Sequence, residues 1–588
     1  MHGTPRYRAL LTSTYPPTTF VRSPVCVFES NVMPLGESES TSASTLDQLA
    51  NDFDKSNIMA PNTADASETS VSDDTATDNE SLSSIEELTA ALLDSKARPP
   101  SSQADQEKAA KIKDEANKIL ATGNYALAVE LYSQAIELDP EKEIYWANRA
   151  QAFIKEEAYG AAIADATKAI DINPNYIKSY YRRALAYTAI LRPKDALKDF
   201  NTVVQRAPAD KSARAKRDEC QKIVRRLVFE AAIEVGEEPS IADSIDYEAM
   251  VVEDSYDGAR LESKTLKTVN GKYPKLEMSL EFIQDMIERF KTGKRLHRKY
   301  VFTIIIEAMK LFKTEPTMVE VDIEEGETMS VCGDTHGQFF DLIELFRFNG
   351  YPSETHSYLF NGDFVDRGSW STENALLLFA YKWMYPKKFF LNRGNHEADE
   401  MNKVYGFEGE CKAKYSEKAF KVFSESFSTL PLATLVGKNY FVLHGGLFSD
   451  DKVTLDDVRK FDRFRQKQPG QNGLMMEMLW TDPQPQPGRG PSKRGVGLQF
   501  GPDVTKRFCE NNRLMAVIRS HEVRMGGYEI EHGGRLITVF SAPNYCDSQG
   551  NKGAVINIKN DYELNFQTYD AVPHPDIKPM AYASNLMM

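Results

Sequence analysis

The heptapeptide Gly362-Asp363-Phe364-Val365-Asp366-Arg367-Gly368 concentrates two carboxylates and a guanidinium between glycines. It follows a short apolar run, Tyr358-Leu359-Phe360, which is typical of a buried strand that ends in a loop. Charged side chains this close together cost too much to bury alone, so they must face water, a metal or an anion. Because Asp and Gly are also ordinary turn residues, the heptapeptide by itself is a weak signal.

The same order of apolar run, loop and ligand-type residue recurs four more times. The loops are Gly333-Asp334-Thr335-His336-Gly337, Arg393-Gly394-Asn395-His396-Glu397, His444-Gly445-Gly446 and Arg519-Ser520-His521-Glu522. In layered α/β folds, functional sites gather at the carboxyl ends of strands. Helical patterns at 339–347 and 372–384 alternate with the expected strands, so the sequence predicts an α/β core.

These loops supply a mixed set of imidazole and oxygen donors without a thiolate, which suits manganese, iron or zinc. A lone His before Gly is more often structural, but three His and two Asp placed after apolar runs reverse that expectation. Six donors are too many for one tetrahedral ion, so we expect two ions about 3.5–4 Å apart that share one Asp. The candidate ligands are Asp334, His336, Asp363, Asn395, His444 and His521.

Upstream, a period of 34 residues appears. Proline recurs at 140, 174 and 208, and alanine recurs at 116, 150 and 184 and again at 128, 162 and 196. Small residues in register let two helices pack closely, and proline stops the second helix of each unit. Residues 105–235 therefore resemble a tetratricopeptide repeat domain, an all-α solenoid of three helix–turn–helix units closed by a capping helix over 211–233.

Five polar residues of this solenoid form a pattern: Lys113 and Asn117, like Lys178 and Arg182, are four residues apart and share a helix face, and Asn148 lies in the first helix of the second unit. They resemble the carboxylate clamp of chaperone-binding tetratricopeptide domains, which implies the acidic C-terminal tail of the ninety-kilodalton heat-shock chaperone as ligand. Cations and amides hold a terminal carboxylate by charge-assisted hydrogen bonds. The alternative interpretation is a solvated basic face. The five residues are Lys113, Asn117, Asn148, Lys178 and Arg182.

Composition bounds the remaining possibilities. The 588 residues predict two or three domains, and a net charge of −15 argues against a nucleic-acid partner. The six cysteines are scattered without a CxxC pair, which favours reduced thiols in the cytoplasm or nucleus. Apolar stretches are broken well before the roughly 18 residues of a membrane span.

The expected domain order follows from these shifts in composition. Residues 29–104 hold 15 acidic and 3 basic residues, so 1–104 is predicted to be a disordered acidic, Ser/Thr-rich extension. Its first 28 residues have the composition of a transit peptide, but an unstructured extension, with Met33 as an alternative start, is the preferred interpretation. A linker over 236–275, a catalytic domain over 276–572 and a tail or helix over 573–588 complete the chain.

The sequences GDTHG, GDFVDRG, RGNHE, HGG and Ser541-Ala542-Pro543-Asn544-Tyr545-Cys546 resemble the phosphoprotein phosphatase family of serine/threonine phosphatases. The resemblance covers roughly residues 105–588. It implies a central β-sandwich flanked by helices and two divalent ions, with manganese expected and iron or zinc as alternatives. One ion would be held by Asp334, His336 and Asp363, the other by Asp363, Asn395, His444 and His521. A water between the ions would attack phosphorus directly.

The resemblance also implies the catalytic roles. Arg367 and Arg494 would hold phosphoryl oxygens, and His396 would be the general acid, oriented by Asp366. Tyr545 would line the site, as a phosphate contact or as wall packing. Arg393 would either assist the chemistry or steady its loop.

Two other functions stay open at this point: a metallophosphoesterase for nucleotides or small esters, and a binding scaffold with an inactive phosphatase fold. A complete ligand set argues against the scaffold. The family further implies autoinhibition, in which the repeats cover the site with Glu157 near Arg367 and residues 576–588 hold the closed state.

Overall fold

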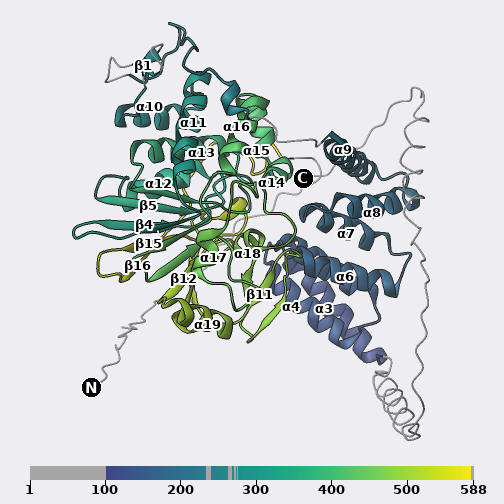
Figure 1. Ribbon diagram of the computed structural model, residues 1–588. Coiled ribbons are helices and arrows are strands. Elements are labelled where there is room, and N and C mark those ends of the chain that lie inside the picture. Colours follow the sequence, from purple (N-terminus) through teal and green to yellow (C-terminus); the bar gives the residue numbers. More distant parts are fainter. Residues whose placement is uncertain (1–100, 234–239, 263–267, 270–272, 275, 584–588) are drawn as a thin grey trace, which may run out of the picture. The chain divides into compact units, whose positions relative to one another are not determined.

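The computed structural model describes residues 101–233, 240–262, 268–269, 273–274 and 276–583 (Figure 1). Nearly all of the predicted acidic extension, residues 1–100, lies outside the described residues. Gln103 begins the first described helix, and the Ser102 side chain caps it by accepting a hydrogen bond from the Asp105 N–H.

Seven helices form the predicted solenoid. The first helices of successive units begin at 143, 177 and 211, and the second helices begin at 125, 159 and 193, so the 34-residue period is confirmed in the structure. The last helix is the first half of an incomplete fourth unit and caps the stack. The helices are α3 (Gln103–Ala121), α4 (Tyr125–Leu138), α5 (Glu143–Lys155), α6 (Tyr159–Ile172), α7 (Ile177–Ala189), α8 (Pro193–Arg206) and α9 (Lys211–Ile233).

Repeated contacts hold each unit together. The six periodic alanines are fully buried, as the close helix packing requires. Between paired helices, Arg149 donates to both carboxylate oxygens of Asp165 at 2.7 and 2.9 Å. One period later, Arg183 does the same to Asp199 at the same two distances. These bidentate bonds tie α5 to α6 and α7 to α8.

Two sheets form the core of the catalytic domain. The first has the order β16-β15-β4-β5-β6 and the second the order β13-β14-β12-β8-β7-β3. Val331 and Leu359 of the first sheet lie in one buried cluster with Val442 and Ile518 of the second, so the sheets pack face to face as the predicted sandwich. The strands are β3 (Met318–Val321), β4 (Thr328–Cys332), β5 (His356–Asn361), β6 (Phe389–Asn392), β7 (Ala433–Val436), β8 (Tyr440–Leu443), β12 (Ala516–Arg519), β13 (Tyr528–Glu531), β14 (Leu536–Val539), β15 (Gly553–Ile558) and β16 (Leu564–Tyr569).

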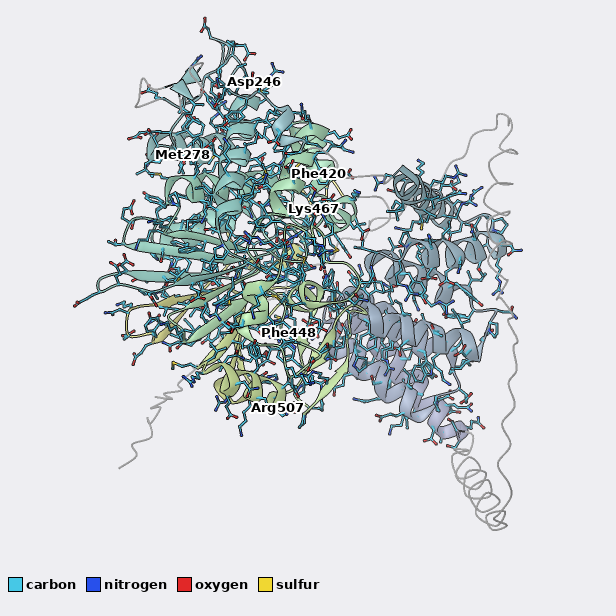
Figure 2. All side chains as sticks on the ribbon, viewed as in Figure 1. Asp246, Met278, Phe420, Phe448, Lys467 and Arg507 are labelled. Atoms are coloured by element: carbon cyan, nitrogen blue, oxygen red, sulfur yellow. The ribbon has the colours of Figure 1, made fainter. Side chains whose placement is uncertain are left out.

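Helices cover the sandwich, as expected for the fold. Phe420 and Phe448, both labelled in Figure 2, belong to the buried clusters beside the first and the second sheet respectively. Beside the first sheet lie α10 (Leu280–Lys291), α11 (Arg298–Thr314), α12 (Phe339–Asn349), α13 (Ser371–Met384), α15 (Phe407–Lys414) and α16 (Glu417–Phe427). Beside the second lie α17 (Leu455–Lys460), α18 (Leu474–Trp480) and α19 (Pro502–Asn512).

A small third sheet, in the order β10-β11-β9, adjoins the site. Its strands are β9 (Asp482–Pro483), β10 (Arg489–Pro491) and β11 (Leu498–Phe500). Strands β10 and β11 are antiparallel, and β11 pairs in parallel with β9. The loop between β10 and β11 carries Arg494.

The two segments that flank the catalytic domain are the predicted linker before it and the predicted tail after it. Within the predicted linker, Ile245, Tyr247 and Leu261 are buried in the same cluster as helices α10 and α11, so residues 240–262 pack onto the catalytic core. Of the predicted tail or helix, residues 573–583 contain turns and no helix, and residues 584–588 lie outside the described residues. No helix in the described part of the chain is long and apolar enough to cross a membrane.

Candidate active site

The ligand-type loops meet at one edge of the sandwich. Strands β4, β5 and β6 run parallel in the first sheet, and β8 and β12 run parallel in the second. Parallel strands present their carboxyl ends on the same side, so the loops that follow them converge. The structure brings together all six predicted ligands, each buried: Asp334, His336, Asp363, Asn395, His444 and His521.

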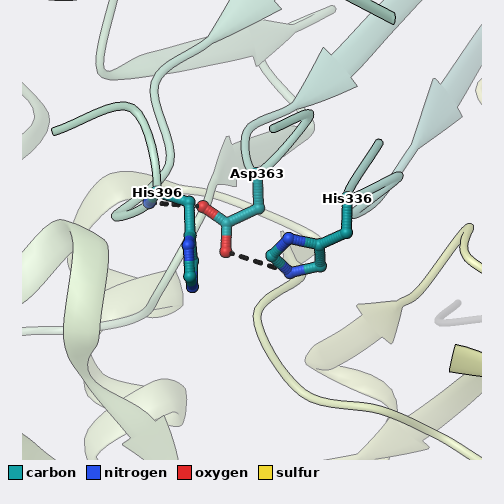
Figure 3. Close-up of side chains that lie close together, drawn as sticks. All are labelled: His336, Asp363 and His396. Atoms are coloured by element: carbon teal, nitrogen blue, oxygen red, sulfur yellow. Dashed lines mark hydrogen bonds and ion pairs between the residues drawn. The ribbon is translucent and has the colours of Figure 1, made fainter. Parts of the chain in front are cut away.

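Asp363 lies at the centre of this group. Its Oδ2 is 3.5 Å from His336 Nε2 and 3.3 Å from His444 Nε2. Figure 3 shows the carboxylate between His336 and the backbone of His396, whose N–H donates to Oδ1 at 2.8 Å. Asp334 Oδ2 is 3.6 Å from His336 Nε2, on the same side as the shared carboxylate.

On the other side, His444 Nε2 is 2.8 Å from Asn395 Oδ1 and 3.1 Å from His521 Nδ1. The opposite nitrogen of His444 faces the Asn361 carbonyl at 2.8 Å, and His336 Nδ1 faces the Val365 carbonyl at 3.0 Å. A ring nitrogen that faces a carbonyl carries the proton, so both Nε2 atoms direct lone pairs into the site. Such lone pairs repel one another unless a cation lies among them, and this donor set fits divalent metal ions.

The charges of the site reinforce this fit. Burial would raise the pKa of Asp363, but His444 and His396 hold it below its usual range, so the carboxylate is charged. Burial would lower the pKa of His336, but Asp334 and Asp363 raise it to about 9, so a proton and a metal ion compete for the lone pair on its Nε2. The buried carboxylates therefore attract cations strongly to this edge of the sandwich.

His396 and Asp366 form a hydrogen-bonded pair beside the metal-type ligands. His396 Nδ1 is 2.9 Å from Asp366 Oδ2, and the same oxygen accepts a hydrogen bond from Asn402 Nδ2 at 2.9 Å. The Phe407 N–H donates to Asp366 Oδ1, also at 2.9 Å. Asp366 therefore fixes His396 with its proton on Nδ1 and leaves Nε2 available.

Arg367 and Tyr545 lie near the metal-type ligands, and of the two Tyr545 lines the cavity there. Arg367 stacks over the Tyr405 ring at 4.0 Å and pairs with Glu157 of the solenoid at 2.8 Å, the contact expected from the sequence. The Tyr545 ring is 5.2 Å from the His336 ring. A cavity of about 730 Å³ is lined by the metal-type ligands Asp334, His336, Asp363 and His521, by His396, Arg494 and Tyr545, and by the solenoid segments 122–126 and 155–158.

Arg393 does not line this cavity. Its guanidinium is fully buried, where Nε donates to the Glu397 carbonyl at 2.9 Å and Nη1 donates to the Lys467 carbonyl at 2.8 Å. Of the two interpretations considered for Arg393, the structure supports the one in which it steadies its loop.

Sequence reasoning missed two residues that hold the site in place. Asn402, on α14 (Asp399–Tyr405), bonds both Asp366 and the His396 carbonyl. Glu397 accepts hydrogen bonds from the N–H groups of Asp363 and Gly394, both at 2.8 Å. Burial, followed by the nearby Asp363 charge, raises the pKa of Glu397 to about 8. Its position directly after His396 was the available signal.

Several site residues have left-handed backbone angles, which side chains other than glycine seldom adopt. The φ angle is 40° at His336, 51° at Asp363, 67° at Asp366, 68° at Arg367 and 71° at His521. Such strain persists only where the surroundings enforce it, and it clusters at functional sites.

On the solenoid, three of the five predicted clamp residues form one connected row. Arg182 Nη1 donates to Asn148 Oδ1 at 3.1 Å, and Asn148 Nδ2 donates to Asn117 Oδ1 at 3.2 Å. Lys113 pairs with Asp114 at 2.7 Å, and Lys178 is exposed one turn before Arg182 on α7. The row crosses α3, α5 and α7, the first helices of the three units.

Comparison with known families agrees with this architecture. Residues 329–525 match the family described as calcineurin-like phosphoesterase. Residues 120–142 and 144–176 match the tetratricopeptide repeat, and residues 217–320 match the PPP5 TPR repeat region. The fold and the site thus define a metallophosphatase with an N-terminal repeat domain.

Individual relatives narrow this class. The chain is 66% identical over 444 residues to serine/threonine-protein phosphatase T of Aspergillus oryzae, covering 76% of this chain and 90% of the relative. It is 49% identical to serine/threonine-protein phosphatase 5 of Rattus norvegicus, covering 83% and 95%. The chain belongs to this family of serine/threonine-protein phosphatases 5 and T.

A solved Saccharomyces cerevisiae structure is described as a protein serine/threonine phosphatase with similarity to human phosphatase PP5. It is 55% identical to this chain, with a TM-score of 0.50, and covers 52% of this chain and 100% of its own.

Proposed function

We propose that this chain hydrolyses phosphoserine and phosphothreonine in proteins by direct attack of water on phosphorus, without a phosphoenzyme. The observation that carries the proposal is the shared Asp363 carboxylate between two sets of ligand atoms, with the His396–Asp366 pair beside it. Two divalent ions, manganese first and iron or zinc as alternatives, would be held by the six ligands named above. When bound, they supply the Lewis acidity that makes water a nucleophile near neutral pH.

The chain's own residues account for the rest of the chemistry. A seryl or threonyl alkoxide is a poor leaving group, so it requires a proton as the bond to phosphorus breaks. His396 in its imidazolium form donates that proton from Nε2 and keeps the proton on Nδ1, where the Asp366 carboxylate orients the ring and stabilises its charge.

Two guanidinium groups orient the phosphoryl group. Arg367 and Arg494 place positive charge where the charge of the transition state spreads over the phosphoryl oxygens. Tyr545, packed against His336, forms the wall of the site on that side.

A substrate comparison tests this function. With manganese present, the full chain should release phosphate from a phosphoserine peptide far faster than from a nucleotide monophosphate. The Asp363→Asn variant, which removes the shared carboxylate charge, should lose both activities. A preference for the nucleotide would support the alternative metallophosphoesterase function.

We further propose that the solenoid binds the acidic C-terminal tail of the ninety-kilodalton heat-shock chaperone. The hydrogen-bonded row of Arg182, Asn148 and Asn117 supports the proposal, because it presents a guanidinium and amides to one ligand. A fluorescent acidic peptide that ends in a free carboxylate should bind, and the same peptide with a C-terminal amide should not.

The solenoid also restrains the catalytic site in this proposal. Glu157 pairs with Arg367, and the Tyr405 hydroxyl donates to the Ala189 carbonyl at 3.0 Å. In the tail, the Met580 N–H donates to the Arg367 carbonyl at 2.6 Å. An acidic peptide opens this state only by its differential affinity for the open form. Removing residues 1–234 should therefore raise the phosphatase rate, and an unchanged rate would refute the closed state.

The cytoplasm and the nucleus are the proposed locations. The five cysteines in the described part of the chain are free thiols, which suits a reducing compartment. Imaging of a tagged chain tests this, and secretion would contradict it.

A further inference from the structure

Asp482 is a buried carboxylate that bridges two arginines at the edge of the active site. Its Oδ2 accepts a hydrogen bond from Arg494 Nε at 2.6 Å, and its Oδ1 accepts one from Arg519 Nη2 at 2.9 Å. Asp482 is 4% exposed and Arg519 is fully buried. A carboxylate with both oxygens committed in this way has no freedom to move, so it defines a fixed point beside the cavity.

The second arginine ties this fixed point to the backbone around the metal-type ligands. Arg519 Nε donates to the carbonyl of Gly445, which directly follows the ligand His444, at 2.6 Å. Arg519 Nη1 donates to Glu522, which directly follows the ligand His521, at 2.7 Å. Through Arg519, Asp482 is thus connected to both loops of the second sheet that carry metal-type ligands.

The first arginine is oriented by the same carboxylate. Arg494 Nε is held by Asp482, and Arg494 Nη2 donates to the His521 carbonyl at 2.7 Å. Two of its three nitrogens are therefore committed, and both commitments lie on one side of the planar guanidinium. The remaining nitrogen, Nη1, belongs to a side chain that lines the cavity together with Asp363 and His396.

The local fold explains why Asp482 can do this. Arg494 lies on the loop between β10 and β11, and a loop alone places a long side chain poorly. Strand β9, which contains Asp482, pairs with β11 at the base of that loop, with Gln499 opposite Asp482. The pairing sets the distance between the carboxylate and the arginine before any ligand binds.

We propose that Asp482 is a positioning residue for the phosphatase reaction, which aims Arg494 so that Nη1 meets the phosphoryl oxygens. The inference rests on the proposed role of Arg494 as a phosphate-binding group. An arginine that must find its orientation anew in each turnover would contribute less, because pre-organised donors are what lower the barrier. Asp482 itself makes no contact with the substrate in this proposal.

Charge supports the same assignment. Burial would raise the pKa of Asp482, but Arg494 and Arg519 hold it below its usual range, so the carboxylate is ionised. Burial would lower the pKa of Arg494, but Asp482 and Glu522 raise it, so the guanidinium is charged. The cation is therefore already in place when the phosphate arrives.

A double-mutant cycle in the full chain tests the inference. Asp482→Asn keeps the shape of the side chain and a hydrogen-bond acceptor but removes its charge. With manganese saturating, it should lower kcat/KM on a phosphoserine peptide by about 10- to 100-fold. The inhibition constant of inorganic phosphate should rise in parallel, since the anion loses its oriented partner. In an Arg494→Ala background, Asp482→Asn should change kcat/KM by less than about twofold.

A purely structural role predicts a different pattern. If Asp482 only anchors Arg519, the losses from Asp482→Asn and Arg494→Ala multiply, and the phosphate inhibition constant does not move with the first substitution. Either result overturns the inference. If Arg494→Ala by itself leaves kcat/KM unchanged, the proposed role of Arg494 fails first, and the cycle shows which of the two ideas is wrong.

Two further variants control for folding. Asp451→Asn removes a carboxylate that pairs with Arg489 on the same hairpin at 2.6 Å, without a contact to Arg494, and should leave kcat/KM within about twofold. Asp482→Glu keeps the charge that Arg519 needs but moves it by one methylene. If the Asn variant does not fold, the Glu variant should show the same loss in kcat/KM, again absent in the Arg494→Ala background. A Glu variant with full activity overturns the inference.

Discussion

Gly160 is the point at which one added methyl group should separate the solenoid from the catalytic domain. It is the second residue of α6, and a Cβ there would lie 2.6 Å from Gly495 N, 2.8 Å from Gly495 Cα and 2.9 Å from the Ser492 carbonyl. These atoms belong to the backbone of the loop that carries Arg494. The neighbouring Ala161 N–H donates to the Lys493 carbonyl of the same loop at 3.1 Å.

The substitution Gly160→Ala should have opposite effects on the two states. Gly160 has no left-handed φ, and alanine is about 1 kcal/mol more favourable than glycine inside a helix, so the solenoid itself should become slightly more stable. The docked state, by contrast, cannot hold a Cβ at 2.6 Å from backbone atoms without a shift. Overpacking of this kind typically costs about 1–3 kcal/mol, which corresponds to a shift of about 5- to 150-fold toward the open form.

The assay is the initial rate on a phosphoserine peptide without any chaperone peptide. Gly160→Ala should raise this basal rate, and the extra stimulation by an acidic C-terminal peptide should shrink while the peptide still binds. Ala164→Leu is the matched control, because it adds bulk at an exposed position of the same helix. The reasoning is refuted if Gly160→Ala binds the peptide normally and keeps the low basal rate while the chain without residues 1–234 is more active.

Four further substitutions test the site and the solenoid. His396→Asn should slow phosphoserine hydrolysis by about 100-fold or more but slow an ester with an acidic phenol far less, because only the alkoxide needs a proton; equal losses would remove His396 from that role. Asp363→Asn should lower the bound manganese from two ions per chain, measured by elemental analysis after desalting, and an unchanged metal content would contradict the shared ligand. Arg182→Ala should weaken the binding of an acidic C-terminal peptide, measured by fluorescence anisotropy, by about 10-fold or more, whereas unaltered binding would exclude the clamp. Arg149→Ala should destabilise the solenoid by about 3 kcal/mol in urea unfolding, since it leaves the Asp165 carboxylate buried without its bidentate partner; a change below about 1 kcal/mol would show that the pair is not needed.

The role of a residue could not be predicted from the sequence where its contacts come from segments far away in the chain. Asp482 acquires its role from Arg494 and Arg519, which reach it through a strand pairing that no local pattern announces. Asn402 holds Asp366 from a separate helix. Likewise, nothing in the acidic composition of residues 240–262 indicated that Tyr247 would be buried against the catalytic core.

The amino-acid sequence by itself determined the repeat period and the metal-type ligands, because both depend on residues close together in the chain. Helices that repeat every 34 residues need small residues at fixed positions. The carboxyl ends of parallel strands lie at the same edge of a sheet, so ligands that directly follow such strands come together there. Only the tertiary structure decided which arginine is aimed and which is merely buried, as the contrast between Arg494 and Arg393 illustrates. The direction of a long, flexible charged side chain depends on partners from distant segments, and those partners meet only when the sheets have packed.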